Sequence, residues 1–534
     1  MVAAVEEWSL SDAQREETVK RIEGNISTMG FFRNAPIPDD VVAAAAAAVE
    51  KKAYATARVE ARTTTGVRPH HETLKAYIRK LSALVLEVVQ NGGQLEQAGA
   101  QAGDEEFDLT GSREFLTKET AEEVLAPLLA PGARFKKVKF STKSFGVEAA
   151  EVAARALENI ASTLEEADMS DIIAGRPEHE ALQALRIISA ALGRARLRRL
   201  DLSDNALGEK GIRASAAAFQ EQEALESIAF GNVGCSIHGC RAVDELLQNT
   251  GSLKRLHLYN NMSGDEGAAA IARLLARSPQ MEDFRMVSSR VGGEGGVALA
   301  KGLAAGSSLV RLDISDNPMT SEIAEDLAAA LRQHAGLRSL NLNDTSLGDD
   351  GVATVAEAVS EAAHELEELE LALNEITPEG AGAVAAALAG KRALRRLNLR
   401  ENELEDEGAL TIAKVVIERV DLVGGLGVLV VLAIAALEAL EHVDFCQNQL
   451  KRGGACALAK AVANKPALAL LHLDENEISE AGIDALKAIM EAHGKLEALG
   501  SLEENMPDEG DEEDEGEEEG GDDELAASMA KATI

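Results

Sequence analysis

A fixed period runs through most of this chain. The pattern LxxLxLxxNxL, followed four residues later by glycine, fits the segment that begins at Leu197 and recurs along the sequence. Successive copies begin at 197, 225, 253, 281, 309 and 337, each 28 residues after the last, and then at 366 and 394. Further copies begin at 135, 164, 440 and 468. A period of this length indicates supersecondary units that bury their apolar faces only against their neighbours.

Each unit predicts a short strand followed by a helix. Positions 1, 4 and 6 of the pattern, such as Leu197, Leu200 and Leu202, point into the core, and the asparagine and glycine then turn the chain. Ile271 and Leu275 have the four-residue spacing of a buried helical face. We therefore expect an α/β leucine-rich repeat solenoid of about 12 repeats, a ribonuclease-inhibitor-like horseshoe with a parallel sheet inside and helices outside.

Two intervals depart from the period. The interval from 164 to 197 is 33 residues, which adds about five residues to the loop around 174–177. The interval from 394 to 440 is 46 residues, and its excess coincides with the almost uncharged stretch 422–437. Because a membrane span needs about 20 apolar residues, we expect no direct membrane span here. The stretch 421–438 is either an inserted segment on the outer face or an artefact such as a retained intron.

The flanking segments differ from the repeats. Residues 1–93 predict a helical, alanine-rich domain, with helices from 12 to 22, from Asp40 onward and from 72 to 90, interrupted at Pro36 and Pro38. Residues 94–106 predict a linker, and residues 107–500 the repeat domain with its N-terminal cap. The final segment, 501–534, predicts a disordered tail, because 15 of the 22 residues from 503 to 524 are acidic and none is basic.

Composition excludes several classes of function. The chain has 53 Lys and Arg against 91 Asp and Glu, a net charge of −38, which opposes nucleic-acid binding and suits a basic protein partner. The four cysteines are too unevenly spaced for a disulfide framework or a zinc site, so we expect free thiols and no metal. No P-loop, G-x-S-x-G or H-E-x-x-H motif occurs, which argues against an enzyme with its own substrate site. The acidic N-terminus resembles no secretory signal, so we expect an intracellular protein.

Strand position 5 and the loop that follows it predict an acid-biased ridge. Position 5 faces the concave side of a horseshoe, and a basic partner would be steered to such a surface. Solubility alone also favours exposed charges, so a purely solvating role stays open. The residues that we expect to bind a partner here are Asp201, Asp204, Asn205, Asp313, Asp316 and Asp344.

Several stretches resemble the plant-type Ran GTPase-activating protein family. They are 169–180, 200–213, 260–267, 281–285 and 295–300, and an acidic tail follows the repeats as in that family. The N-terminal domain is similar to the family's Trp-Pro-Pro (WPP) domain. In this chain Trp8 precedes the first helix as in that family, and Ser9-Leu10 stands where the family has Pro-Pro. The resemblance implies targeting through Trp8, nuclear-envelope anchoring proteins as partners, and a cytoplasmic location at the outer nuclear envelope.

The resemblance also implies an activity in trans on Ran-GTP that supports nucleocytoplasmic transport. Ran itself would hold GTP and magnesium, so the chain would need no cofactor of its own, and Ran would supply the glutamine that orients the attacking water. The chain would dock its loop ridge on the Ran switch regions. In this reading Arg176 orients Ran and the loop rather than touching the phosphate, Asn261 matches the catalytic-ridge asparagine, and Asn260 lies beside it.

The residues by themselves leave alternatives open. Arg176 lies in the expanded loop, at the same end of the strands as Asn205 and Asn261, so all three would face one partner. Asn261 is also the consensus asparagine of its repeat, which ordinarily hydrogen-bonds the turn backbone. Arg176 can pair with a neighbouring glutamate, Glu178 or Glu180. A rival hypothesis is a non-catalytic scaffold or inhibitor that binds a protein along its concave face.

Overall fold

The chain forms two compact units, residues 1–100 and residues 101–534, in a computed structural model. The structure describes residues 10–32, 37–60, 62–63, 66–67, 70–90, 105–413, 418–421, 427–430 and 437–506. Each unit has its own core of buried apolar side chains.

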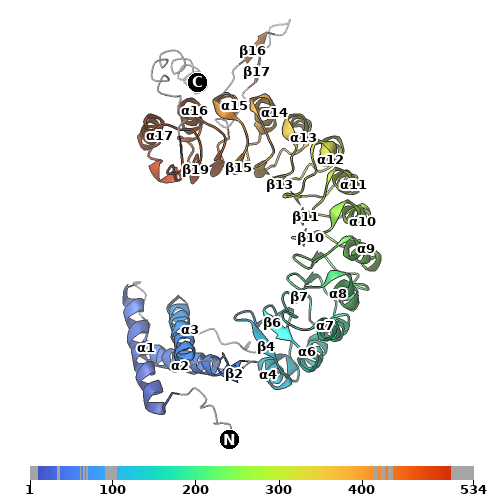
Figure 1. Ribbon diagram of the computed structural model, residues 1–534, viewed down its shortest axis with the longest axis vertical. Helices are drawn as coiled ribbons and strands as arrows, with labels where there is room; N and C mark the ends of the chain where they lie inside the picture. Colours follow the sequence, from blue (N-terminus) through green and yellow to red (C-terminus); the bar gives the residue numbers. More distant parts are fainter. Residues whose placement is uncertain are drawn as a thin grey trace. The chain divides into compact units, whose positions relative to one another are not determined.

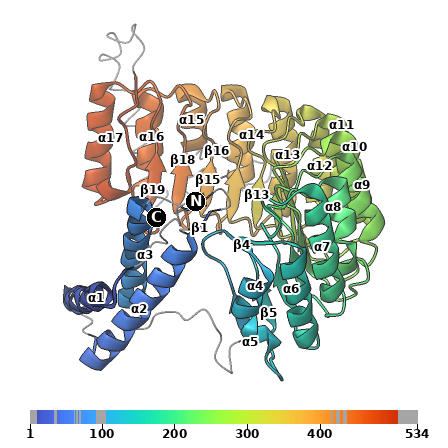
Figure 2. The same ribbon diagram turned by 60° about the horizontal axis from the view of Figure 1, so that its bottom comes forward.

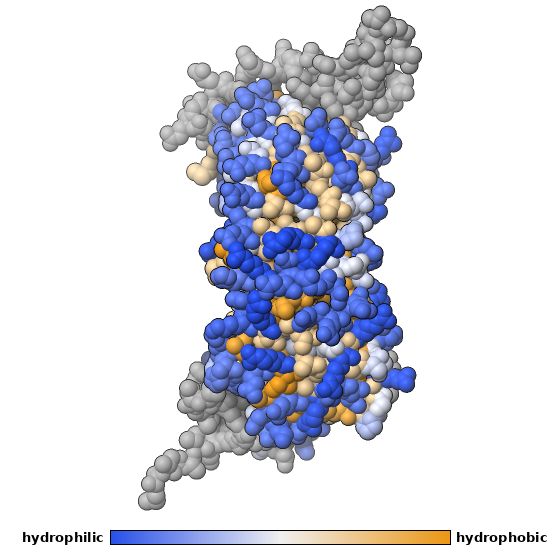
Figure 3. Space-filling model, turned by 90° about the vertical axis from the view of Figure 1, so that its right-hand side faces the viewer, coloured by the Kyte–Doolittle hydropathy of each residue, from blue (hydrophilic) through white to orange (hydrophobic). Residues whose placement is uncertain are grey.

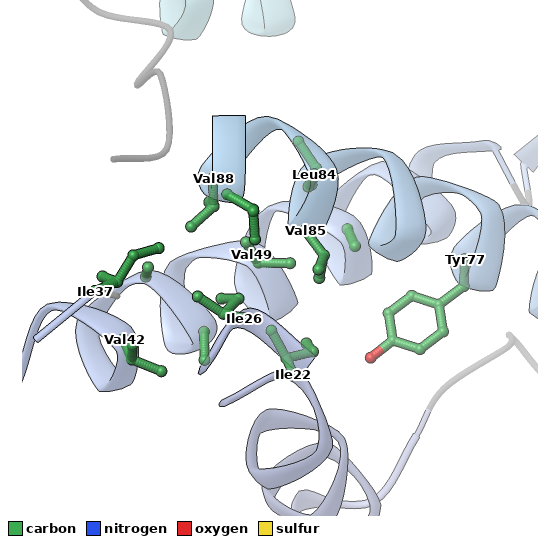
Figure 4. Packing of buried hydrophobic residues seen from close by; sticks show 13 residues of the cluster. Ile22, Ile26, Ile37, Val42, Val49, Tyr77, Leu84, Val85 and Val88 are labelled. Carbon is green, nitrogen blue, oxygen red and sulfur yellow. The ribbon is translucent and has the colours of Figure 1, made fainter. Parts of the chain in front are cut away.

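The first unit is a three-helix domain. Its helices are α1 (Asp12–Phe32), α2 (Asp39–Glu60) and α3 (His70–Gln90), and the short strands β1 (Arg62–Thr63) and β2 (Gly66–Val67) pair between α2 and α3. Apolar side chains from all three helices interlock in one cluster (Figure 4). The labelled members of that cluster are Ile22, Ile26, Ile37, Val42, Val49, Tyr77, Leu84, Val85 and Val88. The three predicted helical segments are therefore present.

A buried polar cluster ties these helices together. Glu50 is only 3% exposed, and its carboxylate accepts hydrogen bonds from Arg15 Nε and Nη2, at 2.8 and 2.6 Å. The Tyr77 hydroxyl donates to the same carboxylate at 3.1 Å. Burial, reinforced by the nearby Glu50 carboxylate, raises the pKa of Tyr77 to about 12. Arg15 of α1 and Tyr77 of α3 thus compensate the buried charge of Glu50 on α2.

The second unit is a solenoid whose strands line the inner side of a curve and whose helices cover the outer side (Figure 1). One parallel sheet runs through it, with neighbouring strands in chain order. Its 13 strands are β3 (Glu106–Asp108), β5 (Lys137–Lys139), β7 (Glu166–Asp168), β8 (Arg199–Asp201), β9 (Ser227–Ala229), β10 (Arg255–Tyr259), β11 (Asp283–Val287), β12 (Arg311–Asp313), β13 (Ser339–Asn341), β14 (Glu368–Glu370), β15 (Arg396–Asn398), β18 (His442–Asp444) and β19 (Leu470–His472). The predicted leucine-rich repeat fold is confirmed.

The helices of successive repeats stand side by side, as Figure 2 shows for α13 to α17. The outer face of the middle repeats is mostly hydrophilic, with narrow apolar stripes (Figure 3). The solenoid helices are α6 (Val147–Ile160), α7 (Glu178–Leu192), α8 (Gly208–Ala214), α9 (Ile237–Leu246), α10 (Gly264–Ala276), α11 (Gly293–Leu303), α12 (Ala324–Leu331), α13 (Gly348–Ala362), α14 (Pro378–Leu388), α15 (Glu405–Ala413), α16 (Arg452–Val462) and α17 (Glu480–Ala492). An N-terminal cap adds β4 (Glu114–Leu116), α4 (Lys118–Val124), α5 (Ala126–Leu129) and β6 (Lys143–Phe145).

The residue at pattern position 8, directly before the position of the consensus asparagine, adopts a left-handed backbone conformation. Asp204, Asn232 and Asn260 have φ angles of 58°, 51° and 52°, and Asp316 and Asp344 repeat the pattern at 53° and 52°. Asp and Asn tolerate this region better than most residues, because their short polar side chains hydrogen-bond locally. These five side chains are exposed and form a row at the carboxyl ends of the strands, which we call the loop ridge.

Two predicted domain boundaries need correction. Glu106, placed in the predicted linker 94–106, already belongs to β3. Residues 501–506, placed in the predicted tail 501–534, pack on the last repeat: Glu504 N donates to Asp474 Oδ1 at 2.8 Å, and Asn476 N donates to Asn505 Oδ1 at 3.0 Å. The Asn505 side chain thus satisfies a backbone N–H of the last described repeat. Residues 507–534 lie outside the described residues.

The predicted insertion 421–438 contains part of an antiparallel hairpin. Its strands are β16 (Glu418–Asp421) and β17 (Gly427–Val430), and most of the remaining segment lies outside the described residues. β15 pairs directly with β18, with Arg396 opposite His442, so the extra residues interrupt no ladder of the main sheet. None of the helices in the described ranges is long and apolar enough to cross a membrane.

Candidate partner-binding site

The expanded loop follows β7 and ends where α7 begins, as the 33-residue interval predicted. Gly175 has a φ of +71°, and a Cβ added there would lie 2.7 Å from the Phe115 ring. The position therefore requires glycine on two counts, backbone conformation and space. Pro177 then stands directly before α7, where its fixed φ suits a helix start.

Arg176 is anchored within this loop. Its side chain is 16% exposed. The guanidinium donates to Ser144 Oγ at 3.0 Å, to the Ser144 carbonyl at 2.8 Å, to the Leu116 carbonyl at 3.2 Å and to Glu180 Oε1 at 3.2 Å. A Cβ on Gly146 would lie 2.8 Å from Arg176 Nη1, so a larger residue would displace the guanidinium. Of the two glutamates offered by the sequence, Glu180 is the one that pairs with Arg176.

An open cleft of about 780 Å³ lies beside Arg176. Its lining comes from the expanded loop, the loop between β8 and α8, the first turns of α7 and α8, and the N-terminal cap. It includes Arg113, Asp171, Arg176, Asp204 and Lys210. Arg113 forms an ion pair with the buried carboxylate of Asp171. The structure thus brings two of the predicted site residues, Arg176 and Asp204, to one cleft that carries charges of both signs.

Hydrogen bonds along the loop ridge connect this cleft to Asn260. Asn232 Nδ2 donates to Asp204 Oδ1, and Asn260 Nδ2 donates to Asn232 Oδ1, both at 3.0 Å. Tyr259 precedes Asn260, is 37% exposed, and packs its ring over Gly231, where a Cβ would lie 1.9 Å from the ring. Asp204, Asn232, Asn260 and Tyr259 therefore form one exposed polar surface next to the cleft.

Asn261 and Asn205 are buried, at 4% and 1% exposed. Asn261 Oδ1 accepts hydrogen bonds from Val233 N at 3.2 Å and Cys235 N at 2.9 Å, and its Nδ2 donates to the Phe230 carbonyl at 2.8 Å. Asn205 makes equivalent bonds to the preceding repeat. This placement corrects the expectation that both side chains face a partner, because buried turn amides need these acceptors. A catalytic role for Asn261 and a partner-binding role for Asn205 remain predictions.

The other predicted partner-binding residues occupy two environments. Asp201 and Asp313 are half-buried at strand ends, and their carboxylates accept hydrogen bonds from Ser203 N at 2.8 Å and Ser315 N at 3.2 Å. Burial, with Asp168 and Asp204 close by, raises the pKa of Asp201. Asp316 and Asp344 are exposed on later repeats of the ridge, away from the cleft lining.

The acidic surface is interrupted at β11. Asp283 Oδ1 lies 3.1 Å from His257 Nε2 and 3.0 Å from Arg285 Nε. Burial opposes ionisation of Asp283, but these two neighbours outweigh it and lower its pKa to about 2. The middle of the sheet therefore carries a compensated charge cluster rather than a continuous acidic field.

Among the described residues, one group has the composition of a metal site. Single potential ligand atoms of Asp444, Cys446 and His472 lie within 4.8 Å of one another. A hydrogen bond of 3.2 Å between His472 and Asp444 Oδ2 accounts for the close approach of those two side chains. Cys235 and Cys240, which the sequence predicted to be free thiols, have sulfur atoms 3.4 Å apart, too far for a disulfide bond.

Sequence reasoning missed Arg113, Phe115 and Asn232. Asn232 occupies the same repeat position as Asp204 and Asn260, so the 28-residue period could have identified it as a member of the loop ridge. Arg113 and Phe115 belong to the N-terminal cap, where no repeat pattern marks them. Their importance depends on contacts with residues about 60 positions away.

Two family models match the chain. A model described as the WPP domain matches residues 4–99, and one described as Leucine Rich repeat matches 197–214, 307–328, 337–356, 363–385 and 391–413. The chain is 44% identical to RAN GTPase-activating protein 2 of Arabidopsis thaliana, across 94% of this chain and 90% of that protein. It is 39% identical to RAN GTPase-activating protein 1 of Arabidopsis thaliana, across 42% of this chain and 43% of that protein. With Ran GTPase-activating protein 1 of Xenopus laevis it shares 33% identity, across 27% and 25%.

The fold and the site define a leucine-rich repeat protein with a polar loop ridge, preceded by a WPP domain. The 44% identity, which extends over nearly the whole of both chains, identifies the family. The chain belongs to the Ran GTPase-activating protein family, of the plant type. The resemblance noted from the sequence is confirmed.

Proposed function

We propose that this chain stimulates GTP hydrolysis by the small GTPase Ran and thereby supports nucleocytoplasmic transport. The observation that carries the proposal is the 44% identity to RAN GTPase-activating protein 2 across nearly the full length of both chains. The loop ridge supports it, because a rigid solenoid that presents polar and acidic side chains can steer and orient a partner with basic residues.

In this mechanism the chain acts in trans and supplies no cofactor. Ran holds GTP and magnesium, and its own glutamine orients the attacking water, while the loop ridge docks on the switch regions and stabilises that arrangement. Arg176 acts by shaping the expanded loop, since its side chain is only 16% exposed and its guanidinium donates hydrogen bonds to Ser144, Leu116 and Glu180. Asn260 is the exposed member of the asparagine pair and would meet Ran directly.

The N-terminal domain is proposed to bind nuclear-envelope anchoring proteins. This would place the activator in the cytoplasm, at the outer nuclear envelope, and the match of the WPP family model to residues 4–99 supports it. Trp8, the predicted targeting residue, lies outside the described residues. A fluorescent fusion of the chain should mark the nuclear rim and lose that position in Trp8→Ala; an unchanged rim signal would remove Trp8 from the contact.

The direct test of the proposed activity is single-turnover hydrolysis of GTP by purified Ran, with and without this chain. Acceleration of phosphate release supports the activator. Absence of acceleration, with binding to Ran-GTP retained, would replace it with the non-catalytic scaffold that binds along its concave face.

Variants of the site residues refine this test. Arg176→Ala and Asn261→Ala should each lower the stimulated rate, and Asn260→Gly should do so while suiting the positive φ at that position. Asn317→Ala is the matched control for Asn261, because Asn317 makes the same buried bonds two repeats further on. Gln447→Gly is the matched control for Asn260, at the same left-handed repeat position. Wild-type rates in all three site variants would overturn the assignment.

A further inference from the structure

The N-terminal cap forms one wall of the expanded loop. β4 and β6 pair as a separate two-stranded parallel sheet, with Phe115 opposite Ser144. The Arg176 guanidinium donates to a carbonyl of each strand, to Leu116 at 3.2 Å and to Ser144 at 2.8 Å. The loop that carries Arg176 is therefore built against the cap as well as on its own repeat.

Phe115 is the exposed side chain of this wall. It is 54% exposed, in a protein whose aromatic content is 3%, and the Arg176 guanidinium carbon lies 5.1 Å from the centre of its ring. The ring also fills the space that a side chain at Gly175 would occupy. A guanidinium over an aromatic face is attracted by the ring quadrupole, so the contact restricts where Arg176 can point.

Arg113 acts on the other end of the same loop. It lies two residues before Phe115, and its guanidinium pairs with Asp171, which lies three residues after the end of β7 and has a positive φ of 54°. Two side chains of one short cap segment thus hold the expanded loop, Arg113 near its start and Phe115 near its end. Both Arg113 and Arg176 also line the cleft.

We propose that Phe115 is a positioning residue of the activator site. Its ring fixes the Gly175 turn and the Arg176 guanidinium in the conformation that docks on Ran, while Arg113 fixes the start of the loop through Asp171. The proposal rests on the proposed function for its effect on Ran. Its structural part, that Phe115 restricts the conformation of residues 171–178, does not depend on the proposed function.

The experiment compares Phe115→Ala, Arg176→Ala, the double variant and Phe115→Tyr in the full chain. Leu496→Ala serves as the control, because Leu496 is an exposed apolar side chain, 44% exposed, in the C-terminal part of the solenoid. The readouts are kcat and KM for Ran-GTP, thermal unfolding, and hydrogen exchange of the backbone amides in residues 171–178.

Phe115→Ala should lower kcat/KM about fivefold and raise exchange in residues 171–178, with an unchanged melting temperature. It should have no further effect in the Arg176→Ala background, because it acts through Arg176. Phe115→Tyr should keep activity and exchange at wild-type levels, and Leu496→Ala should change neither.

Equal losses from Phe115→Ala in both backgrounds would overturn the proposal in favour of direct contact between the ring and Ran. Unchanged exchange in residues 171–178 would overturn it outright. If wild-type protein fails to accelerate Ran, the proposed function fails, and the exchange experiment still decides the hold of Phe115 on the loop.

Discussion

At the scale of single residues, Asn260 and Asn261 show how adjacent identical side chains take opposite roles. Asn260 has a positive φ and an exposed side chain, whereas Asn261 is 4% exposed and bonded to the turn of the preceding repeat. The turn rotates the chain between them, so one amide faces solvent and the other faces the core. A lower activity of an Asn261 variant could therefore come from a disturbed turn as well as from a lost contact with Ran.

Asn261→Ala should lower the free energy of unfolding by about 2 kcal/mol, because Val233 N and Cys235 N would lose their buried acceptor. Urea denaturation measures the change. Asn317→Ala should show a similar loss, and Asn260→Gly should leave stability close to wild type. A fully stable Asn261→Ala that has lost stimulation of Ran would point to direct chemistry instead.

Asp283 should make stability depend on pH in the acid range. Its folded pKa of about 2 lies below the ordinary value of about 3.9, so its contribution is present above about pH 4 and is lost as the pH falls toward 2. We expect Asp283→Asn to be less stable than wild type by about 2 kcal/mol at pH 7, with the difference narrowing toward pH 2. Urea unfolding across this range tests it, and a difference that is constant with pH would exclude the linkage.

At the scale of elements, the repeat unit tolerates additions only where they leave the ladder intact. The five extra residues after β7 form the loop of Arg176, and the insertion after α15 leaves β15 paired directly with β18. Both additions lie in connections between a strand and the next, where extra chain costs little closure entropy. The main sheet therefore continues through both.

Deleting 18 residues, 418–435, should restore the 28-residue interval without loss of stability. Because β15 already pairs with β18, no ladder hydrogen bond of the main sheet is removed. We expect a melting temperature within about 2 °C of wild type, since a change of 1 kcal/mol shifts it by only a few degrees in a domain of this size. Aggregation or a much lower melting temperature would show that the hairpin supports the solenoid.

At the scale of the whole molecule, the chain divides into two units with separate cores. The three-helix unit ends near residue 100, and the cleft and ridge residues all belong to the solenoid. The net charge of −38 divides as well: 15 of these charges come from residues 503–524, and the others are spread over the remaining chain. All the cleft and ridge residues named above thus lie in the second unit.

A chain reduced to residues 101–534 should retain stimulation of Ran, with kcat/KM within about twofold of the full chain, because the second unit is compact in itself and contains the cleft and ridge residues. Single-turnover hydrolysis measures the rate, and circular dichroism verifies that the shortened chain is folded. A folded but inactive solenoid would mean that the WPP domain contributes to catalysis.

The sequence by itself determined the repeat, the parallel sheet, the buried leucines and the loop position of Arg176. Each of these depends on the spacing of residues close together in the sequence. The 28-residue period repeats that spacing many times, so the pattern can be recognised from the sequence. The same period could not distinguish a catalytic role for Asn261 from its role in the turn, because asparagine is expected at this position for either reason.

Only the tertiary structure decided which groups hold the expanded loop. Phe115 and Arg113 meet Arg176 and Asp171 across about 60 residues, and Glu180 rather than Glu178 pairs with Arg176. The cap carries no repeat pattern, and contacts between distant segments arise from packing in three dimensions. Periodicity therefore specifies the scaffold, while the arrangement of the site depends on contacts that no local pattern records.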